Sequence, residues 1–287
     1  MHVRDMRGLA LRWGLGVLLL VCATPFLHAD ESFLALPRAR RAELVHYAKC
    51  ARAAYPGEAI PKGLRPFTET EWKDCVLGQS YAGCTYSPDG FLNVGTGLRA
   101  RLMVSTTSDD VVVAWSGCDL GPSQIKSGGR DVIAVLKLMA GSLDGQYSQA
   151  SHLFEGILLG TRGHVTVVGH SLGGGLTTYV VASAGDTQDR VSGFTFNGLG
   201  FSEKALGRHM TPLRRQRAEE LLVNVKGSRE LLFRLKNMAG LPASHFGKVY
   251  EVPEELLSDW HGINNLIEQM EKSLAAKAGG DDMNQVE

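Results

Sequence analysis

The stretch His164–Gly185, HVTVVGHSLGGGLTTYVVASAG, decides the fold of this chain. It opens with the β-branched apolar run Val165–Val168, which is typical of a strand buried on both faces. Apolar side chains then recur at helical spacing over Leu172–Val180. Between these segments the chain turns abruptly at GHSLG, residues Gly169–Gly173. The pattern predicts a strand, a tight turn with a serine at its apex, and a helix.

A serine at the apex of such a turn is placed as a nucleophile. Gly169 and Gly173, two residues to either side, keep the turn free of Cβ clashes, so that the hydroxyl of Ser171 is presented above the sheet. The N–H of Leu172, at the helix start, points to where the oxyanion of a tetrahedral intermediate forms. The alternative is a Gly-rich turn whose serine only caps the helix. The direct succession of strand, turn and helix favours a serine hydrolase.

The first 29 residues predict export from the cell. Three arginines precede the apolar run Leu15–Val21, and the segment ends at Ala29. This is the pattern of a secretory signal peptide that is cleaved after Ala29. An uncleaved membrane anchor is the alternative, but the apolar run is short for a membrane-spanning helix. We therefore expect a periplasmic or extracellular protein, with a signal peptide over residues 1–29 and one domain over residues 30–287.

The charge balance gives no electrostatic reason to expect a nucleic-acid partner. The chain has 30 Lys and Arg residues and 30 Asp and Glu residues. The predicted signal peptide removes only three arginines and one aspartate. The mature chain is therefore near neutral and lacks the basic excess of a nucleic-acid-binding domain. Its length suffices for one large domain with an extensive core.

The cysteines suggest a disulfide framework. The mature chain contains four of them, Cys50, Cys75, Cys84 and Cys118. An even number in an exported protein favours two disulfides, and the sequence leaves the three possible pairings open. Isolated buried thiols are the alternative. No pair of these cysteines has zinc-finger spacing, and we expect no metal site.

Strands and helices are expected to alternate along the rest of the chain. The other predicted strands are Leu98–Ser105 and Val111–Trp115, which form a hairpin, and Val191–Phe196, Leu221–Val225 and Lys248–Val252. The other predicted helices are Glu43–Tyr55, Asp131–Gly141, Gln146–Leu159, Ser202–Glu220 and Gly262–Ala276. The Pro- and Gly-rich stretch after Tyr55 and the segment Cys75–Pro88 are expected to be irregular. This alternation predicts an α/β fold with a mostly parallel central sheet and helices on both faces.

Together these segments resemble the α/β-hydrolase superfamily, and within it the class 3 lipase-like group. GHSLGG at Gly169–Gly174 matches the nucleophile elbow of that group. Further matching segments are VVVAWSG at Val111–Gly117 for the strand and oxyanion loop, TFNGLG at Thr195–Gly200 for the turn after the elbow, GKVYEV at Gly247–Val252 for the final strand, and WHGINNLI at Trp260–Ile267 for the histidine-bearing segment. The resemblance covers about Leu98 to Ile267. It implies the α/β-hydrolase fold and lipase-like activity.

The chain departs from the pattern of this group in two places. The oxyanion loop reads Ser116-Gly117-Cys118 where Arg-Gly-Thr is typical. In the loop that normally carries the catalytic acid, Ser228 stands where the group usually has aspartate.

Ser171 needs a base to remove its proton and an acid to orient that base. On this fold the order along the chain is serine, acid, histidine. His261 follows the last predicted strand and is the predicted base; His245 precedes that strand and is the alternative. His209 falls in the predicted basic helix and is expected at the surface. His170, which flanks the nucleophile, is expected to pack rather than react.

The remaining roles follow from position. Glu230 is the only carboxylate in the loop after the predicted strand Leu221–Val225, so it is the predicted acid; a solvated surface glutamate is the alternative. The expected oxyanion donors are the N–H groups of Leu172 and Cys118. We expect no cofactor, because this chemistry uses side chains alone.

The sequence thus predicts an exported serine hydrolase that cleaves carboxylic esters, such as lipids or other acyl esters, through an acyl-enzyme on Ser171. Its partner would be a small-molecule or lipid ester, with transient contact to a lipid interface. One alternative is a non-catalytic binding protein that has kept the fold, since the usual aspartate is missing. Another is an acyltransferase that uses the same nucleophile.

Overall fold

The computed structural model describes residues 30–75, 84–94, 97–117, 146–184, 189–200, 211–228, 245–253 and 262–275. Within these ranges one sheet is built from β1 (Glu31–Ser32), β2 (Leu64–Pro66), β3 (Cys84–Tyr86), β4 (Phe91–Val94), β5 (Arg99–Ser105), β6 (Val111–Trp115), β7 (Val165–His170), β8 (Val191–Phe196), β9 (Leu222–Gly227) and β10 (Lys248–Val252). The strand order is β1-β10-β9-β8-β7-β6-β5-β4-β3, and β2 pairs with β5.

The sheet changes from antiparallel to parallel at β6. β5 and β6 form an antiparallel pair, and so do β4 with β5, β3 with β4 and β2 with β5. From β6 to β10, and on to β1, all neighbours are parallel. The antiparallel pairing of β5 and β6 confirms the predicted hairpin. The connection between the two strands is too short for a parallel crossover. As a result, the carboxyl ends of β6 to β10 meet at one edge of the sheet.

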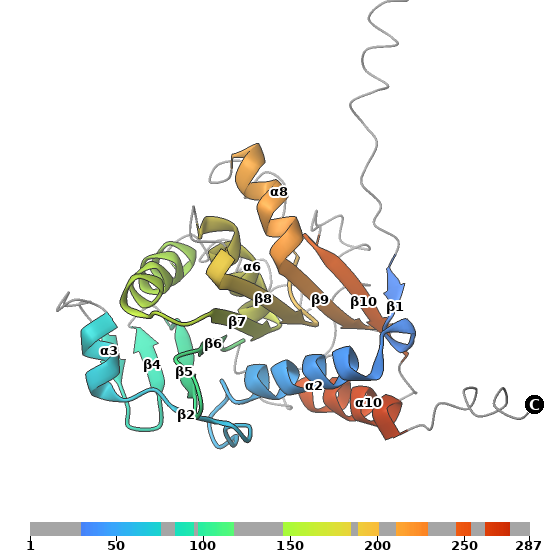
Figure 1. Cartoon of the computed structure of the whole chain (residues 1–287), viewed down its shortest axis with the longest axis horizontal. Helices are drawn as coiled ribbons and strands as arrows, with labels where there is room; N and C mark the ends of the chain where they lie inside the picture. The colour runs from blue at the N-terminus through green and yellow to red at the C-terminus, as the bar shows by residue number, and fades with distance from the viewer. Residues whose placement is uncertain are drawn as a thin grey trace, which may run out of the picture.

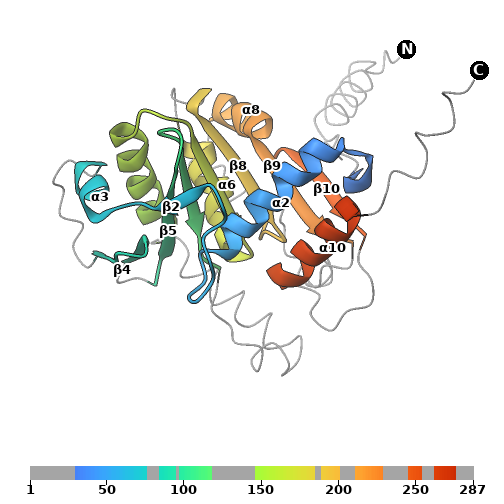
Figure 2. The same ribbon diagram turned by 60° about the horizontal axis from the view of Figure 1, so that its bottom comes forward.

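Helices cover both faces of the sheet (Figure 1 and Figure 2). α2 (Arg38–Arg52) and α10 (Ile263–Ala275) pack on one face and enclose one apolar core. α6 (Leu172–Ser183), α8 (Pro212–Leu221) and the helical residues 146–160 pack on the other face, around a second core. The shorter elements are η1 (Phe33–Ala35) and α3 (Glu69–Cys75). The predicted α/β fold with helices on both faces is confirmed.

β7 lies inside the sheet, between β6 and β8, and all six of its residues are buried. Val165 and Val167 belong to the core under α6, whereas Val168 belongs to the core under α2. Because side chains alternate along a strand, His170 points to the α2 face. Each fully buried valine contributes about 1.5–3 kcal/mol relative to an exposed one. The prediction of a strand buried on both faces is confirmed.

Some boundaries differ from those predicted. α2 spans Arg38–Arg52 rather than Glu43–Tyr55. It ends early because a residue that precedes proline disfavours helix, and Tyr55 precedes Pro56. The stretch after Tyr55 was expected to be irregular but contains β2, and the expected irregular segment Cys75–Pro88 contains β3. β4 was not predicted.

These short strands extend the antiparallel edge of the sheet, where pairing with a neighbouring strand outweighs weak local propensity. The predicted helix over residues 131–141 lies outside the described residues. Of the predicted helix Ser202–Glu220, the described part is α8.

The expected pair of disulfides is not present. Cys50, Cys75 and Cys84 are free thiols, and Cys118 lies outside the described residues. Cys50 is in the core under α2, while Cys75 and Cys84 contact the core on the opposite face. The sheet therefore separates Cys50 from the other two thiols. Burial raises the pKa of Cys50 to about 12 and that of Cys75 to about 11. These thiols are therefore poor sources of thiolate at neutral pH.

Among the described helices, none is both long enough and apolar enough to cross a membrane. The predicted signal peptide, residues 1–29, lies outside the described residues.

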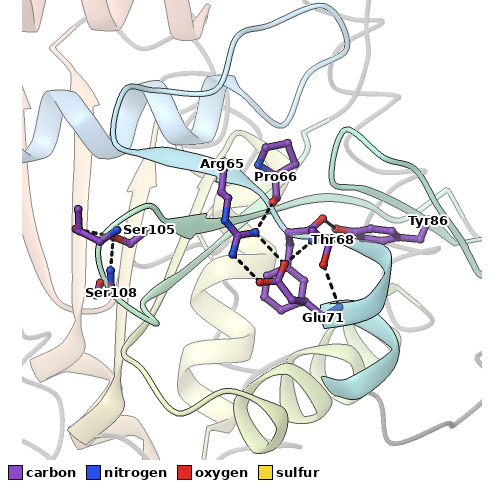
Figure 3. Close-up of polar contacts among 9 residues, drawn as sticks. Arg65, Pro66, Thr68, Glu71, Tyr86, Ser105 and Ser108 are labelled. Carbon is purple, nitrogen blue, oxygen red and sulfur yellow. Dashed lines mark hydrogen bonds and ion pairs between the residues drawn. The ribbon is translucent and has the colours of Figure 1, made fainter.

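The antiparallel end of the sheet carries a fully formed helix cap, shown in Figure 3. At the start of α3, the backbone N–H of Glu71 donates to the Thr68 hydroxyl over 3.2 Å, and the N–H of Thr68 donates to the Glu71 carboxylate over 2.6 Å. This reciprocal pair is a capping box, which satisfies N–H groups that the helix leaves free. Arg65 on β2 donates to both carboxylate oxygens of Glu71, over 2.7 and 3.0 Å. The contact ties α3 to β2.

The Arg65 guanidinium, together with the N–H and hydroxyl of Thr68, lowers the pKa of Glu71 from 4.5 to about 2. Since the pKa is depressed in the folded protein, the carboxylate stabilises the fold above about pH 4.5, and this contribution is lost as the pH falls from 4.5 towards 2. We predict that Glu71→Gln lowers the melting temperature at pH 7 and lowers it less at pH 3. Thermal denaturation of both proteins at both pH values measures this; an equal difference at both would contradict it.

Candidate active site

Ser171 lies at the apex of the turn between β7 and α6. Its backbone has φ 58° and ψ −122°. Among the described residues, Asn197 is the only other non-glycine residue with a positive φ. Such a conformation costs about 1–3 kcal/mol and is typical of functional sites. Backbone hydrogen bonds hold it in place: Ser171 N–H donates to Phe196 C=O over 3.2 Å, and Ser171 C=O accepts from Leu199 N–H over 2.9 Å.

Two glycines of the turn are needed for close backbone packing. A Cβ on Gly169 would lie 2.1 Å from the carbonyl oxygen of Gly173. A Cβ on Gly173 would lie 2.1 Å from the carbonyl oxygen of Trp115, at the end of β6. Neither position tolerates a side chain without moving backbone. The sequence interpretation of these glycines, freedom from Cβ clashes, is confirmed.

The segment that leaves β6 packs directly against Ser171. A Cβ on Gly117 would lie 2.8 Å from the carbonyl oxygen of His170 and 3.2 Å from Cβ of Ser171. Cys118, the predicted oxyanion donor, follows Gly117 and lies outside the described residues. Leu172, the other predicted donor, is the first residue of α6, so its N–H has no acceptor inside that helix. The start of α6 and the end of β6 therefore converge on Ser171, which is the arrangement an oxyanion hole requires.

Tyr55, which no sequence motif marks, also contacts this site. Its hydroxyl is hydrogen-bonded to Nδ1 of His170 over 2.8 Å. The same hydroxyl oxygen would lie 2.5 Å from a Cβ on Gly117. His170 itself is buried, as predicted, with its ring on the α2 face. The only local signal for Tyr55 was its place at the end of an amphipathic helix, which is too common to mark a site.

The start of the acid loop lies at the same edge of the sheet. Ser228, which directly follows β9, donates its N–H to the carbonyl of Val252, the last residue of β10, over 2.9 Å. Since both strands are parallel to β7, this places Ser228 at the carboxyl edge with Ser171. Glu230, the predicted acid, lies two residues further on and outside the described residues.

A buried lysine anchors the end of β9. Lys226 is 6% exposed, and its ammonium lies 2.5 Å from a carboxylate oxygen of Asp30 and 3.5 Å from one of Glu251. A lysine is rarely buried without such partners, because desolvation of its charge is costly. These contacts join β9 to β10 and to Asp30, the residue before β1. Lys226 lies two residues before Ser228. No local sequence pattern indicated them.

The direction of β10 determines at which edge of the sheet His245 lies. His245 lies three residues before Lys248, the first residue of β10. Because β10 is parallel to β7, His245 lies at the amino edge, a strand length of about 16 Å from the edge that carries Ser171. His261 lies outside the described residues, as does His209, and Gly262 directly follows His261. This geometry disfavours His245 as the base.

The residues after His261 are held by α2. Arg52, the last residue of α2, donates from Nη1 to Oδ1 of Asn264 in α10 over 3.3 Å. The same end of α2 leads into Tyr55. Within the described ranges, no group of three or more His, Cys, Asp and Glu side chains is arranged to hold a metal ion.

Comparison with solved structures gives similarity to fungal lipases. For a triacylglycerol lipase from Penicillium expansum, the identity is 14% and the TM-score 0.42, and the match covers 83% of this chain and 88% of that chain. For a lipase from Rhizopus microsporus var. chinensis, the identity is 16% and the TM-score 0.40, with 76% of this chain and 75% of that chain covered. No curated protein sequence matches the chain.

The family profile of the Tle-like phospholipase domain matches residues 46–239, about two thirds of the chain. The matched range includes β6, the turn at Ser171, β8 and β9. The chain has the sheet, the turn between β7 and α6 and the converging β6 segment of an α/β-hydrolase, and it belongs to the phospholipase-like family of Tle-like phospholipase domains.

Proposed function

We propose that this protein is an exported serine hydrolase that cleaves the acyl-ester bonds of phospholipids through an acyl-enzyme on Ser171. One observation carries the proposal: Ser171 is held at positive φ between strand and helix, with Gly117 packed against its Cβ. The family supports a lipid ester as the substrate class. Export rests on the predicted signal peptide, residues 1–29.

The proposed chemistry uses the predicted catalytic residues in two steps. The hydroxyl oxygen of Ser171 attacks the ester carbonyl carbon while His261 takes the hydroxyl proton. The N–H groups of Leu172 and Cys118 bind the oxyanion that forms. When the tetrahedral intermediate collapses, the alcohol leaves with the proton from His261. Water then attacks the acyl-enzyme by the same steps in reverse, and the carboxylic acid leaves.

Glu230 is proposed to orient His261 and to balance the charge of its imidazolium. The two alternative functions, an acyltransferase and a binding protein, use the same residues differently. An acyltransferase passes the acyl group to an alcohol instead of water. A binding protein has no use for a strained Ser171, and its case rests on Ser228 replacing the usual aspartate.

The nucleophile is tested by Ser171→Ala. We predict loss of hydrolysis of short p-nitrophenyl esters and of phospholipid vesicles, with a nearly unchanged thermal transition, because the hydroxyl supplies chemistry and not core packing. Hydrolysis and melting of purified wild type and variant are measured together. Turnover retained in the purified variant would exclude Ser171 as the nucleophile.

The base is tested by comparing two histidines. His261→Ala should lower kcat by several orders of magnitude, about 10⁴-fold by analogy with the loss of a triad member. His245→Ala should leave kcat close to wild type, because His245 lies at the opposite edge of the sheet. Steady-state kinetics of the two variants rank them, and the reverse ranking would show that the base is misassigned.

The acid is tested by Glu230→Gln, which should preserve the fold and reduce kcat, since the imidazolium loses its counter-charge. Ser228→Asp is the matched addition: Ser228 lies at the carboxyl edge beside Val252, so an aspartate there should restore activity to Glu230→Gln. Kinetics of the single and double variants measure both effects. A wild-type rate in Glu230→Gln would mean that Glu230 does not serve the histidine.

A further inference from the structure

The Tyr55 hydroxyl touches both halves of the candidate site. It is hydrogen-bonded to Nδ1 of His170, the residue before the nucleophile, over 2.8 Å. It also lies beside Gly117, where a Cβ would be only 2.5 Å from the hydroxyl oxygen. One oxygen atom therefore contacts both the end of β7 and the segment that leaves β6.

Tyr55 is itself fixed by a buried arginine. Arg101, on β5, is 7% exposed, and its Nη1 donates to the carbonyl oxygens of Ala53 and Glu58 over 3.0 and 2.7 Å. These acceptors lie on either side of Tyr55 in the turn after α2. Its Nε donates to the carbonyl of Asp89 over 3.0 Å. A guanidinium that makes three hydrogen bonds to backbone holds this turn against the sheet, because a buried charge must keep its partners.

The geometry points to Tyr55 as a positioning residue of the oxyanion hole, which sets the distance between the β6 segment and the nucleophile turn through its hydroxyl. This inference rests on the proposed hydrolysis at Ser171. Tyr55 makes no covalent step and acts through Gly117 and His170. Cys118, the proposed donor, directly follows Gly117 along the chain.

The physical consequence is a defect in the transition state. Oxyanion donors act only when they lie about 2.7–3.1 Å from the developing charge, and a misplacement of about 1 Å costs about 100-fold in rate. Binding of the uncharged ester depends little on this distance. Removal of the Tyr55 hydroxyl should therefore lower kcat and leave KM nearly unchanged. A purely structural tyrosine would lower the melting temperature instead.

The test is Tyr55→Phe, with Tyr86→Phe as a matched control. Tyr86→Phe also removes one hydrogen-bonding hydroxyl, which donates to the backbone carbonyl of Phe67 (Figure 3). Tyr86 lies on β3, at the far edge of the sheet. We expect Tyr55→Phe to lower kcat for p-nitrophenyl esters by about 10- to 100-fold, with KM within about twofold. Tyr86→Phe should keep the wild-type kcat.

A second variant tests the route. His170→Leu removes the other half of the hydrogen bond, and the double variant with Tyr55→Phe should be no slower than the slower single variant, because one contact is lost in all three. A double variant whose loss equals the product of the two single losses overturns the proposal. So does Tyr55→Phe with wild-type kcat, with a change confined to KM, or with an unfolded chain in thermal melting.

The wild type in the same assay separates the two levels of the proposal. Active wild type with an unaffected Tyr55→Phe overturns only the role of Tyr55. A folded wild type that is inactive in every ester assay contradicts the proposed function and this inference with it.

Discussion

Close backbone contact around Ser171 is the constraint on which the rest of the site depends. The turn at Ser171 presses on the end of β6 through Gly173, and on itself through Gly169, at separations that exclude a side chain. The strained φ of Ser171 is held by hydrogen bonds to the end of β8 and the turn that follows it. Three adjacent parallel strands therefore define one small volume at the carboxyl edge.

Residues at the end of α2 and in the turn after it contact this edge of the sheet. Tyr55, three residues after α2, contacts β7 at His170, and Arg52 at the end of α2 contacts the start of α10. Arg101 donates to carbonyl oxygens on either side of Tyr55 and so holds the turn after α2. The same segment thus contacts both the nucleophile side and the residues that follow the proposed base. This gives α2 a role in the geometry of the site in addition to its role in the core.

The sequence predicts best what is encoded locally. The buried strand β7, the serine turn and the β5–β6 hairpin each follow from a few adjacent residues, and the structure contains all three. Contacts between distant residues left no such signal: Tyr55 and His170 are 115 residues apart, and Lys226 and Asp30 are 196 apart. For Cys50, the failed disulfide prediction has the same cause. Counting cysteines does not reveal that the sheet lies between Cys50 and the other two described thiols.

Ser171 is proposed to be a nucleophile that is activated within this site. The most direct test is labelling of the folded protein with a fluorophosphonate probe, followed by mass mapping of the labelled peptide. We expect one adduct, on the peptide that contains Ser171, and no labelling of Ser171→Ala. A folded wild type that is not labelled, or that is labelled equally after Ser171→Ala, would contradict it.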